Sequence, residues 1–168
     1  MKGVPVNDAH PMEEVKHAPA VWLPAVAALW ACRTTLGFGL LADARFLIAE
    51  NSRLRQWSDA WPNLTHDYFW SASGNTIPYW RPLTKASWLL ETLAGGGAVW
   101  PYHLVQALWF AVACAGVAAL ALHLGAWPLW AGLFGCVAAL HPACAEPVGL
   151  VMARSDVVAA ACSLTCSK

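Results

Sequence analysis

The chain has 168 residues, of which 58% are hydrophobic and 12% are charged, and it carries no formal net charge. Soluble domains usually contain about 25% charged residues, so this composition and the mean hydropathy of +0.47 indicate a membrane protein. The balanced charge leaves no basic surface, and we expect no nucleic-acid partner. The 6 cysteines form no CxxC pair, which predicts neither a disulfide framework nor a metal site.

Several apolar stretches approach the length of about 20 residues that a helix needs to cross a bilayer. They follow a polar amino-terminal tail over residues 1–19 and lie near residues 20–42, 101–123, 127–141 and 148–166. Tryptophans lie in or beside them, and this residue favours the boundary between membrane and water. We therefore predict an all-α, polytopic membrane protein with about four transmembrane helices.

The connection over residues 43–99 is too long for a simple loop, and connections of this size are often functional. It contains amphipathic segments with several tryptophans and other large apolar residues, which are typical of helices that lie in the headgroup region. Residues 83–93 predict a short helix that ends at the glycines of residues 95–97. If each apolar stretch crosses once, residues 43–99 and 142–147 lie on the same, outer side.

The same crossing pattern collects ionisable side chains at one face of the membrane. Because lipid makes such groups costly, a collection of this kind indicates a functional site. The candidates are Asp43, Arg81, His103, His141, Glu146, Arg154 and Asp156.

Each candidate has a functional and an ordinary interpretation. Asp43 is either a general base or a solvated helix end. Arg81 and Arg154 can each bind a phosphate bidentately. In the ordinary interpretation, Arg81 is a surface cation and Arg154 is one half of an ion pair. The histidines can contact phosphate or cap helix ends, and the other two carboxylates can orient an acceptor or pair with Arg154. We expect Arg154 to lie deep enough in the membrane to need a carboxylate partner. Glu146 or Asp43 is favoured over Asp156 as this partner, and His141 is expected near the same cleft.

Ordered motifs join these residues to their neighbours. They are Asp43 with Glu50-Asn51, then Asp67-Tyr68-Phe69-Trp70, Trp80-Arg81-Pro82-Leu83, Tyr102-His103-Leu104, and His141-Pro142 with Glu146, Val148, Arg154 and Asp156. Over about residues 20–166, this order resembles the amino-terminal membrane region of the transmembrane-and-TPR-repeat O-mannosyltransferase-like proteins. That family is related to the protein O-mannosyltransferases of the C-type glycosyltransferase superfamily.

The resemblance implies that residues 20–168 form part of a glycosyltransferase membrane domain with an outward-facing active site. It implies a sugar donor on a polyprenyl phosphate, such as dolichyl phosphate mannose, and a protein hydroxyl or a glycan as acceptor. Asp43 matches the position of the catalytic base. The chain departs from the family pattern at Ala44, where a second acidic residue is common, and at Gln106, where an asparagine often stands.

The family has further membrane helices and carboxy-terminal TPR repeats, so we expect a fragment of a longer multi-pass protein. Its partners would be membrane lipid and the lipid-linked sugar, in a bacterial inner membrane or in the endoplasmic reticulum of a eukaryote. Two alternatives remain open, namely a non-catalytic or degenerate fragment and a piece of a transporter. The long outer connection favours the transferase, whereas a transporter often shows inverted repeats.

Overall fold

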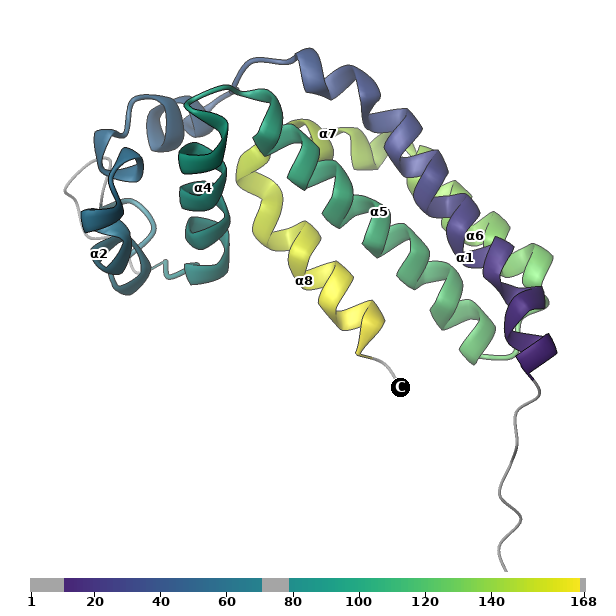
Figure 1. The fold of residues 1–168 in the computed structure, drawn as a ribbon. Helices are drawn as coiled ribbons and strands as arrows, with labels where there is room; N and C mark the ends of the chain where they lie inside the picture. The colour runs from purple at the N-terminus through teal and green to yellow at the C-terminus, as the bar shows by residue number, and fades with distance from the viewer. Residues whose placement is uncertain (1–10, 71–78, 167–168) are drawn as a thin grey trace, which may run out of the picture.

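The computed structural model describes residues 11–70 and 79–166, and within those ranges every regular element is helical. Four helices run side by side as a bundle, and the chain between the first two forms a lobe beside one end of it (Figure 1). The bundle consists of α1 (Pro11–Cys32), α5 (Trp100–His123), α6 (Pro128–Leu140) and α8 (Arg154–Thr165). The predicted all-α membrane architecture is thereby confirmed.

The lobe and the connections are built from short helical segments. In the lobe these are η2 (Arg45–Ala49), η3 (Ser52–Arg55), η4 (Trp57–Asp59), α2 (Ala60–Thr65) and α4 (Pro82–Gly95). The remaining segments are η1 (Arg33–Gly37), η5 (Pro142–Cys144), α7 (Ala145–Gly149) and η6 (Val151–Ala153). Helix α4 begins with a proline at its first position and ends before Gly96, whose φ of 59° lies in the left-handed region that suits glycine.

By length and composition, two of the described helical stretches can cross a membrane, namely Ala18–Gly37 and Trp100–His123. A third span results if α6 and the segment Pro142–Gly149, bent by 54°, act as one. The predicted stretch near residues 148–166 is interrupted at Leu150, where the backbone is extended. The 12 residues of α8 give a helix of about 18 Å, which is shorter than the hydrocarbon core of about 30 Å.

Small residues let the bundle helices approach closely. A Cβ atom added at Gly135 of α6 would lie 2.5 Å from Cγ of Pro24 on α1 and 2.9 Å from the carbonyl oxygen of Cys114 on α5. A Cβ atom added at Gly132 would lie 3.4 Å from the backbone of Ala20 on α1, which is ordinary van der Waals contact. Close approach of this kind is typical of packed membrane helices. Pro24 therefore lies inside α1 as part of this interface.

The bundle and the lobe each have a hydrophobic core. The bundle core consists mainly of small side chains, among them Ala28, Cys32, Ala111 and Cys114. The lobe core consists mainly of larger side chains, among them Leu47, Ile48, Leu54, Tyr68, Trp88 and Tyr102. Tyr102 belongs to α5, so the lobe is packed onto the start of that bundle helix.

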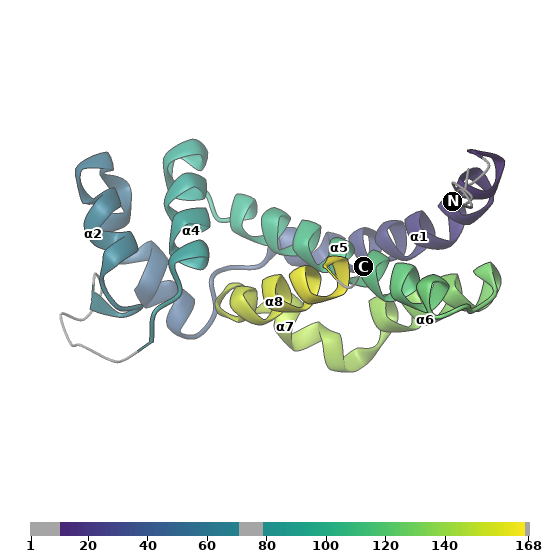
Figure 2. The same cartoon turned by 90° about the horizontal axis from the view of Figure 1, so that it is seen from below.

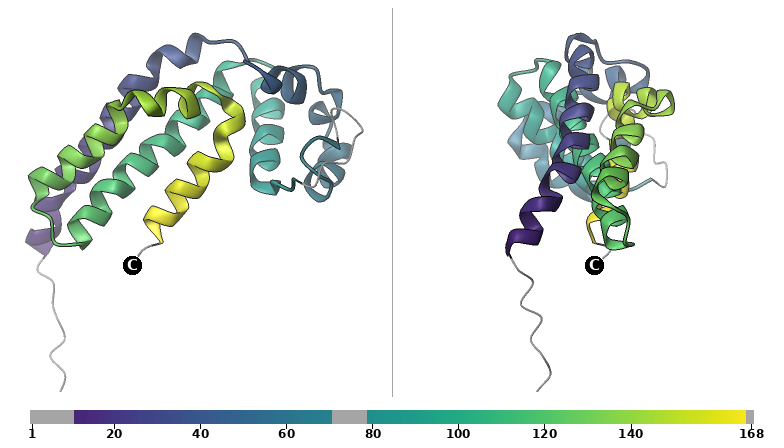
Figure 3. Two further views of the ribbon diagram at one scale, coloured as in Figure 1. Left: turned by 180° about the vertical axis from the view of Figure 1, so that it is seen from behind. Right: turned by 90° about the vertical axis from the view of Figure 1, so that its right-hand side faces the viewer.

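The lobe and the connection between α6 and α8 lie at the same end of the bundle, whereas the turn from α5 to α6 lies at the other end (Figure 3). Seen from below, α2 and α4 stand to one side of the bundle helices (Figure 2). The described residues of 43–99 and residues 142–147 thus lie at one end of the bundle, and their location on one side of the membrane stays a prediction. We call this end of the bundle the lobe end.

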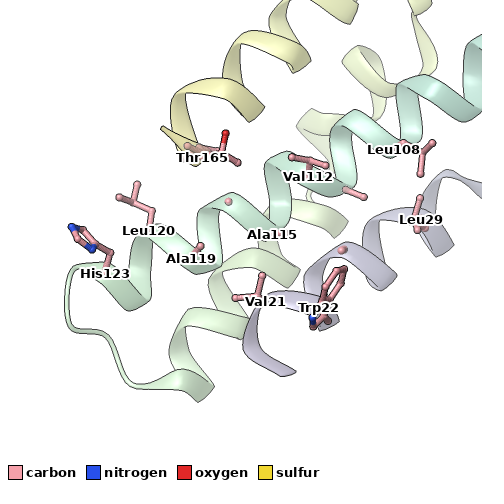
Figure 4. A pocket seen from close by; sticks show the side chains of 14 residues that line it. Val21, Trp22, Leu29, Leu108, Val112, Ala115, Ala119, Leu120, His123 and Thr165 are labelled. Atoms are coloured by element: carbon pink, nitrogen blue, oxygen red, sulfur yellow. The ribbon is translucent and has the colours of Figure 1, made fainter. Parts of the chain in front are cut away.

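An apolar groove of about 600 Å³ lies on the bundle between α1, α5 and the end of α8 (Figure 4). Val21, Leu29, Val112 and Leu120 are among the residues that line it. It lies along the bundle helices and none of the seven candidate site residues lines it. Such a face is what lipid or another membrane helix would cover.

Candidate functional site at the lobe end

Arg154 is the first residue of α8, and its side chain is fully buried. Its Nε donates to Oε1 of Gln106 at 3.3 Å, and its Nη2 donates to the carbonyl oxygen of Tyr102 at 2.7 Å. Its Nη1 donates to Oγ of Ser87 at 2.7 Å and forms an ion pair with the carboxylate of Glu91. The guanidinium therefore connects α4, α5 and α8 at one point.

The structure confirms that Arg154 is buried and paired with a carboxylate, but the predicted partner was wrong. Glu146 and Asp43 were favoured, and both of these side chains are exposed. The chain breaks at Leu150 and restarts as a helix at Arg154, so the guanidinium points toward the inner face of α4 rather than toward α7. Glu91 lies on that inner face.

Sequence reasoning missed Glu91, although a signal for it was present. The buried positions of α4 recur at helical spacing and include Thr84, Trp88, Glu91 and Thr92. A carboxylate on the apolar face of an amphipathic helix needs a buried partner. Burial raises the pKa of Glu91 to about 7, while the nearby Arg154 acts in the opposite direction.

Tyr68 lies in the lobe core, together with Ala44 and Trp88 and in contact with Arg81. Its ring is 3% exposed and packs against Trp88, with 5.4 Å between the ring centroids. The guanidinium carbon of Arg81 lies 5.3 Å from the ring centroid of Tyr68. Burial raises the pKa of the Tyr68 hydroxyl, the charges of Arg81 and Arg154 oppose this, and the charge of Asp43 adds to it.

Asp43 lies between η1 and η2, where the chain passes from the bundle into the lobe, and its side chain is exposed. The preceding Ala42 has a φ of 50°, which is unusual for a residue with a side chain. Strained backbone of this kind persists where the surrounding structure holds it, and it is frequent at functional sites. Ala44, by contrast, is 1% exposed and packs in the lobe core, so an acidic side chain at this position would be buried.

His103 is 1% exposed in the first part of α5. Its ring lies next to the backbone of Phe38 and Gly39, but neither ring nitrogen has a hydrogen bond of ordinary geometry to the described residues. Buried polar groups are nearly always hydrogen-bonded. His103 is therefore a buried side chain at the lobe end, packed against the backbone that follows η1.

The remaining three candidates lie apart from Tyr68. Nδ1 of His141 accepts a hydrogen bond from the backbone N–H of Ala143 at 3.2 Å, which is the helix-capping role. His141 also lines a cavity of about 280 Å³ at the lobe end, between α1, α5 and α7. Glu146 is exposed on α7, and Asp156 is exposed in the first turn of α8, where it accepts from Ser155.

A second groove, of about 320 Å³, runs between the start of α4 and one face of α8. Leu83, Val158, Ala159 and Cys162 form much of its wall, and Arg81 lies at its edge. The groove therefore combines apolar walls with one guanidinium. Among the side chains of residues 18–70 and 79–166, no three His, Cys, Asp or Glu groups are placed to hold a metal ion.

An apolar helical bundle with charged side chains collected at one end defines the class of protein as an all-α membrane protein with a polar site at that end. Comparison of the sequence with known proteins identifies its relatives. The chain is 36% identical over 135 residues to protein O-mannosyl-transferase Tmtc2 of Drosophila melanogaster, covering 77% of this chain. It is 32% identical over 135 residues to protein O-mannosyl-transferase Tmtc1 of the same organism, again covering 77% of this chain.

The chain is thus related in sequence to the protein O-mannosyl-transferases, and the predicted resemblance is confirmed. It spans 14% and 15% of the lengths of these two relatives. No family model and no solved structure matches the chain.

Proposed function

We propose that this chain forms part of the active site of a membrane glycosyltransferase. The enzyme transfers a sugar from a polyprenyl-phosphate donor to a hydroxyl acceptor. The observation that supports the proposal is the placement of Arg81 over the ring of Tyr68, in the same lobe core that contains Ala44, the residue next to Asp43. Asp43 is an exposed carboxylate, and Arg81 is a half-buried guanidinium. A base and a cation are the two groups that such a transfer needs.

The chemistry assigns each group one task. Asp43 accepts the proton of the acceptor hydroxyl as its oxygen attacks the anomeric carbon of the sugar. The bond between that carbon and the phosphate oxygen breaks, and the lipid phosphate leaves with the electron pair. Arg81 stabilises the charge that develops on the phosphate. A carboxylate general base of this kind contributes about 10²–10⁴-fold to the rate.

The groove between α4 and α8 supports a lipid-linked donor. Its apolar wall can receive the first isoprene units, while Arg81 at the edge binds the phosphate. A donor whose lipid stays in the bilayer needs this combination of an apolar surface and a cation at the membrane boundary. Arg154 is excluded from direct phosphate binding, because it is fully buried and bonded to the protein.

The proposal is tested by transfer of radiolabelled mannose from dolichyl phosphate mannose to hydroxyl-bearing peptides, using the chain in detergent or liposomes. Asp43→Asn should lower the rate by about 10²–10⁴-fold without loss of membrane insertion. Glu50→Gln, which changes another exposed carboxylate of the lobe, is the matched control. Full activity of Asp43→Asn would place the base elsewhere, and no transfer by the unaltered chain would refute the proposal for this chain.

A further inference from the structure

We infer that Glu91 is a positioning residue, which clamps Arg154 and thereby holds α4, with Arg81 at its amino-terminal end, against the bundle. The inference about α4 and the bundle rests on the contacts of Glu91 alone. The consequence for Arg81 as a phosphate ligand rests on the proposed function.

The first step is the state of the Arg154 guanidinium. This group has five N–H donors and no acceptor, and its described bonds reach the side chains of Gln106, Ser87 and Glu91 and the backbone of Tyr102. Two of these partners belong to α4 and two to α5. With no exposed surface, Arg154 is a connection between helices rather than a ligand for substrate.

The second step is the position of Glu91 in this connection. Glu91 is the acidic partner of Arg154, and its side chain is 7% exposed. Removing one member of a buried ion pair is strongly destabilising, because it leaves the other charge uncompensated. Arginine cannot release this charge by deprotonation near neutral pH. Loss of Glu91 should therefore drive α4 and α8 apart.

The third step leads from α4 to the candidate site. Trp88 lies on α4 one helical turn before Glu91, and its ring packs against Tyr68. Tyr68 in turn supports the guanidinium of Arg81. Displacement of α4 would move both contacts together. Glu91 thus acts on Arg81 through Trp88 and Tyr68, without touching the proposed substrate.

The polar contacts around Arg154 extend to α7. Nε2 of Gln106 donates to the carbonyl oxygen of Pro147 at 2.6 Å while its Oε1 accepts from Arg154. The four segments α4, α5, α7 and α8 therefore meet in one buried polar network. Such networks are stabilising when their members are satisfied and sensitive when one member is removed.

Cleavage by trypsin after Lys85 measures this clamp directly. Lys85 lies on α4, is 2% exposed, and donates from Nζ to the carbonyl oxygen of Asp67 at 2.9 Å. Trypsin can cut there only when this part of α4 unfolds and Lys85 leaves its contact with Asp67. In the full chain in detergent at pH 8, Glu91→Leu should raise the rate of this cut by about tenfold or more, because local opening exposes the site.

Glu50→Leu is the matched control, since Glu50 pairs with Arg45 on the exposed surface. Its cleavage after Lys85 should equal that of the unaltered chain. Glu91→Gln keeps an oxygen acceptor for Nη1 of Arg154 but leaves its charge uncompensated, so its rate of cleavage should lie between those of the unaltered chain and Glu91→Leu. Glu91→Leu combined with Arg154→Met removes both charges and should restore the protection. Equal cleavage in Glu91→Leu and Glu50→Leu, or no rescue by the double variant, would overturn the inference.

A binding measurement separates this inference from the proposed function. Decaprenyl phosphate in micelles serves as the probe, and its dissociation constant is measured for the unaltered chain and for Glu91→Leu. If the clamp positions Arg81, Glu91→Leu should bind the probe about tenfold more weakly, and Glu91→Gln should have an intermediate affinity. If the unaltered chain does not bind the probe, the proposed donor is wrong, and the clamp is still judged by cleavage after Lys85. Unchanged probe binding by an opened Glu91→Leu would refute the link to Arg81.

Discussion

Arg81 lies over the aromatic face of Tyr68, with 5.3 Å between its guanidinium carbon and the ring centroid. A stacked guanidinium keeps its in-plane N–H groups free for a second partner, and those groups match the geometry of a phosphate. Arg154 is the opposite case, because its N–H groups are directed into the protein. The two arginines, which are both candidate phosphate ligands by sequence, therefore differ in their surroundings.

The first prediction concerns phosphate binding by Arg81. Arg81→Gln should weaken binding of decaprenyl phosphate in micelles by about 10–100-fold, which corresponds to the loss of a charge-assisted hydrogen bond. Arg53→Gln is the matched control, because Arg53 also stacks on an aromatic ring, that of Trp70, at 4.6 Å. Equal weakening by both variants would show that general charge, rather than the site, attracts the phosphate.

The second prediction concerns the sides of the membrane. Single cysteines introduced at Ser58 and Ala143, which are both exposed at the lobe end, should react with an impermeant maleimide from the same side. A cysteine introduced at Leu124, which is 77% exposed in the turn between α5 and α6, should react from the other side. The test requires a background without the six native cysteines. Reaction of positions 58 and 143 from opposite sides would disprove the shared outer side.

Helical character and membrane location could be predicted because both depend on local composition. The apolar run of α5 and its opening proline mark that helix in the sequence itself. The burial of Arg154 was also predictable, since a lone cation in an apolar segment needs a partner. These inferences require no knowledge of which segments meet in space.

The partner of Arg154 could not be predicted, because it depends on tertiary structure. The sequence separation between Arg154 and Glu91 is 63 residues, and no periodicity links them. The break at Leu150 also decides where α8 begins, and hence which way Arg154 points. Tyr68 was visible as part of a motif, but its position between Arg81 and Trp88 arises when the lobe folds onto α5.

The third prediction concerns helix packing in the bundle. Gly135→Ala should lower the free energy of unfolding by about 1–3 kcal/mol, because the new methyl group would overlap Pro24 and the backbone of Cys114. Gly149→Ala is the control, since a Cβ atom there meets no atom within 4 Å. Thermal unfolding in one detergent compares the two variants. A Gly135→Ala protein as stable as the control would show that α1 and α6 are not in close contact.

The fourth prediction concerns the pH dependence of stability. Burial lowers the pKa of Lys85 from its ordinary value of 10.5 to about 8, while the nearby charge of Asp67 opposes the shift. Between these two pH values the unfolded chain binds more protons than the folded chain at this position, so stability should rise with pH across that window. The contribution is present above the unfolded pKa and is lost as pH falls through about 8.

Lys85→Met isolates this contribution, because methionine fills a similar volume and does not titrate. The unfolding free energy of the unaltered chain minus that of Lys85→Met should increase by about 1–3 kcal/mol between pH 8 and pH 10.5, as expected for a shift of this size. Below pH 7 the difference should be constant, since Lys85 is then charged in both states. Denaturant titrations in one detergent at a series of pH values measure the difference, and other titrating groups cancel in it. A difference that does not change from pH 8 to pH 10.5 would mean that the ammonium group of Lys85 is in contact with water, and that α4 does not lie against the lobe core as the structure shows.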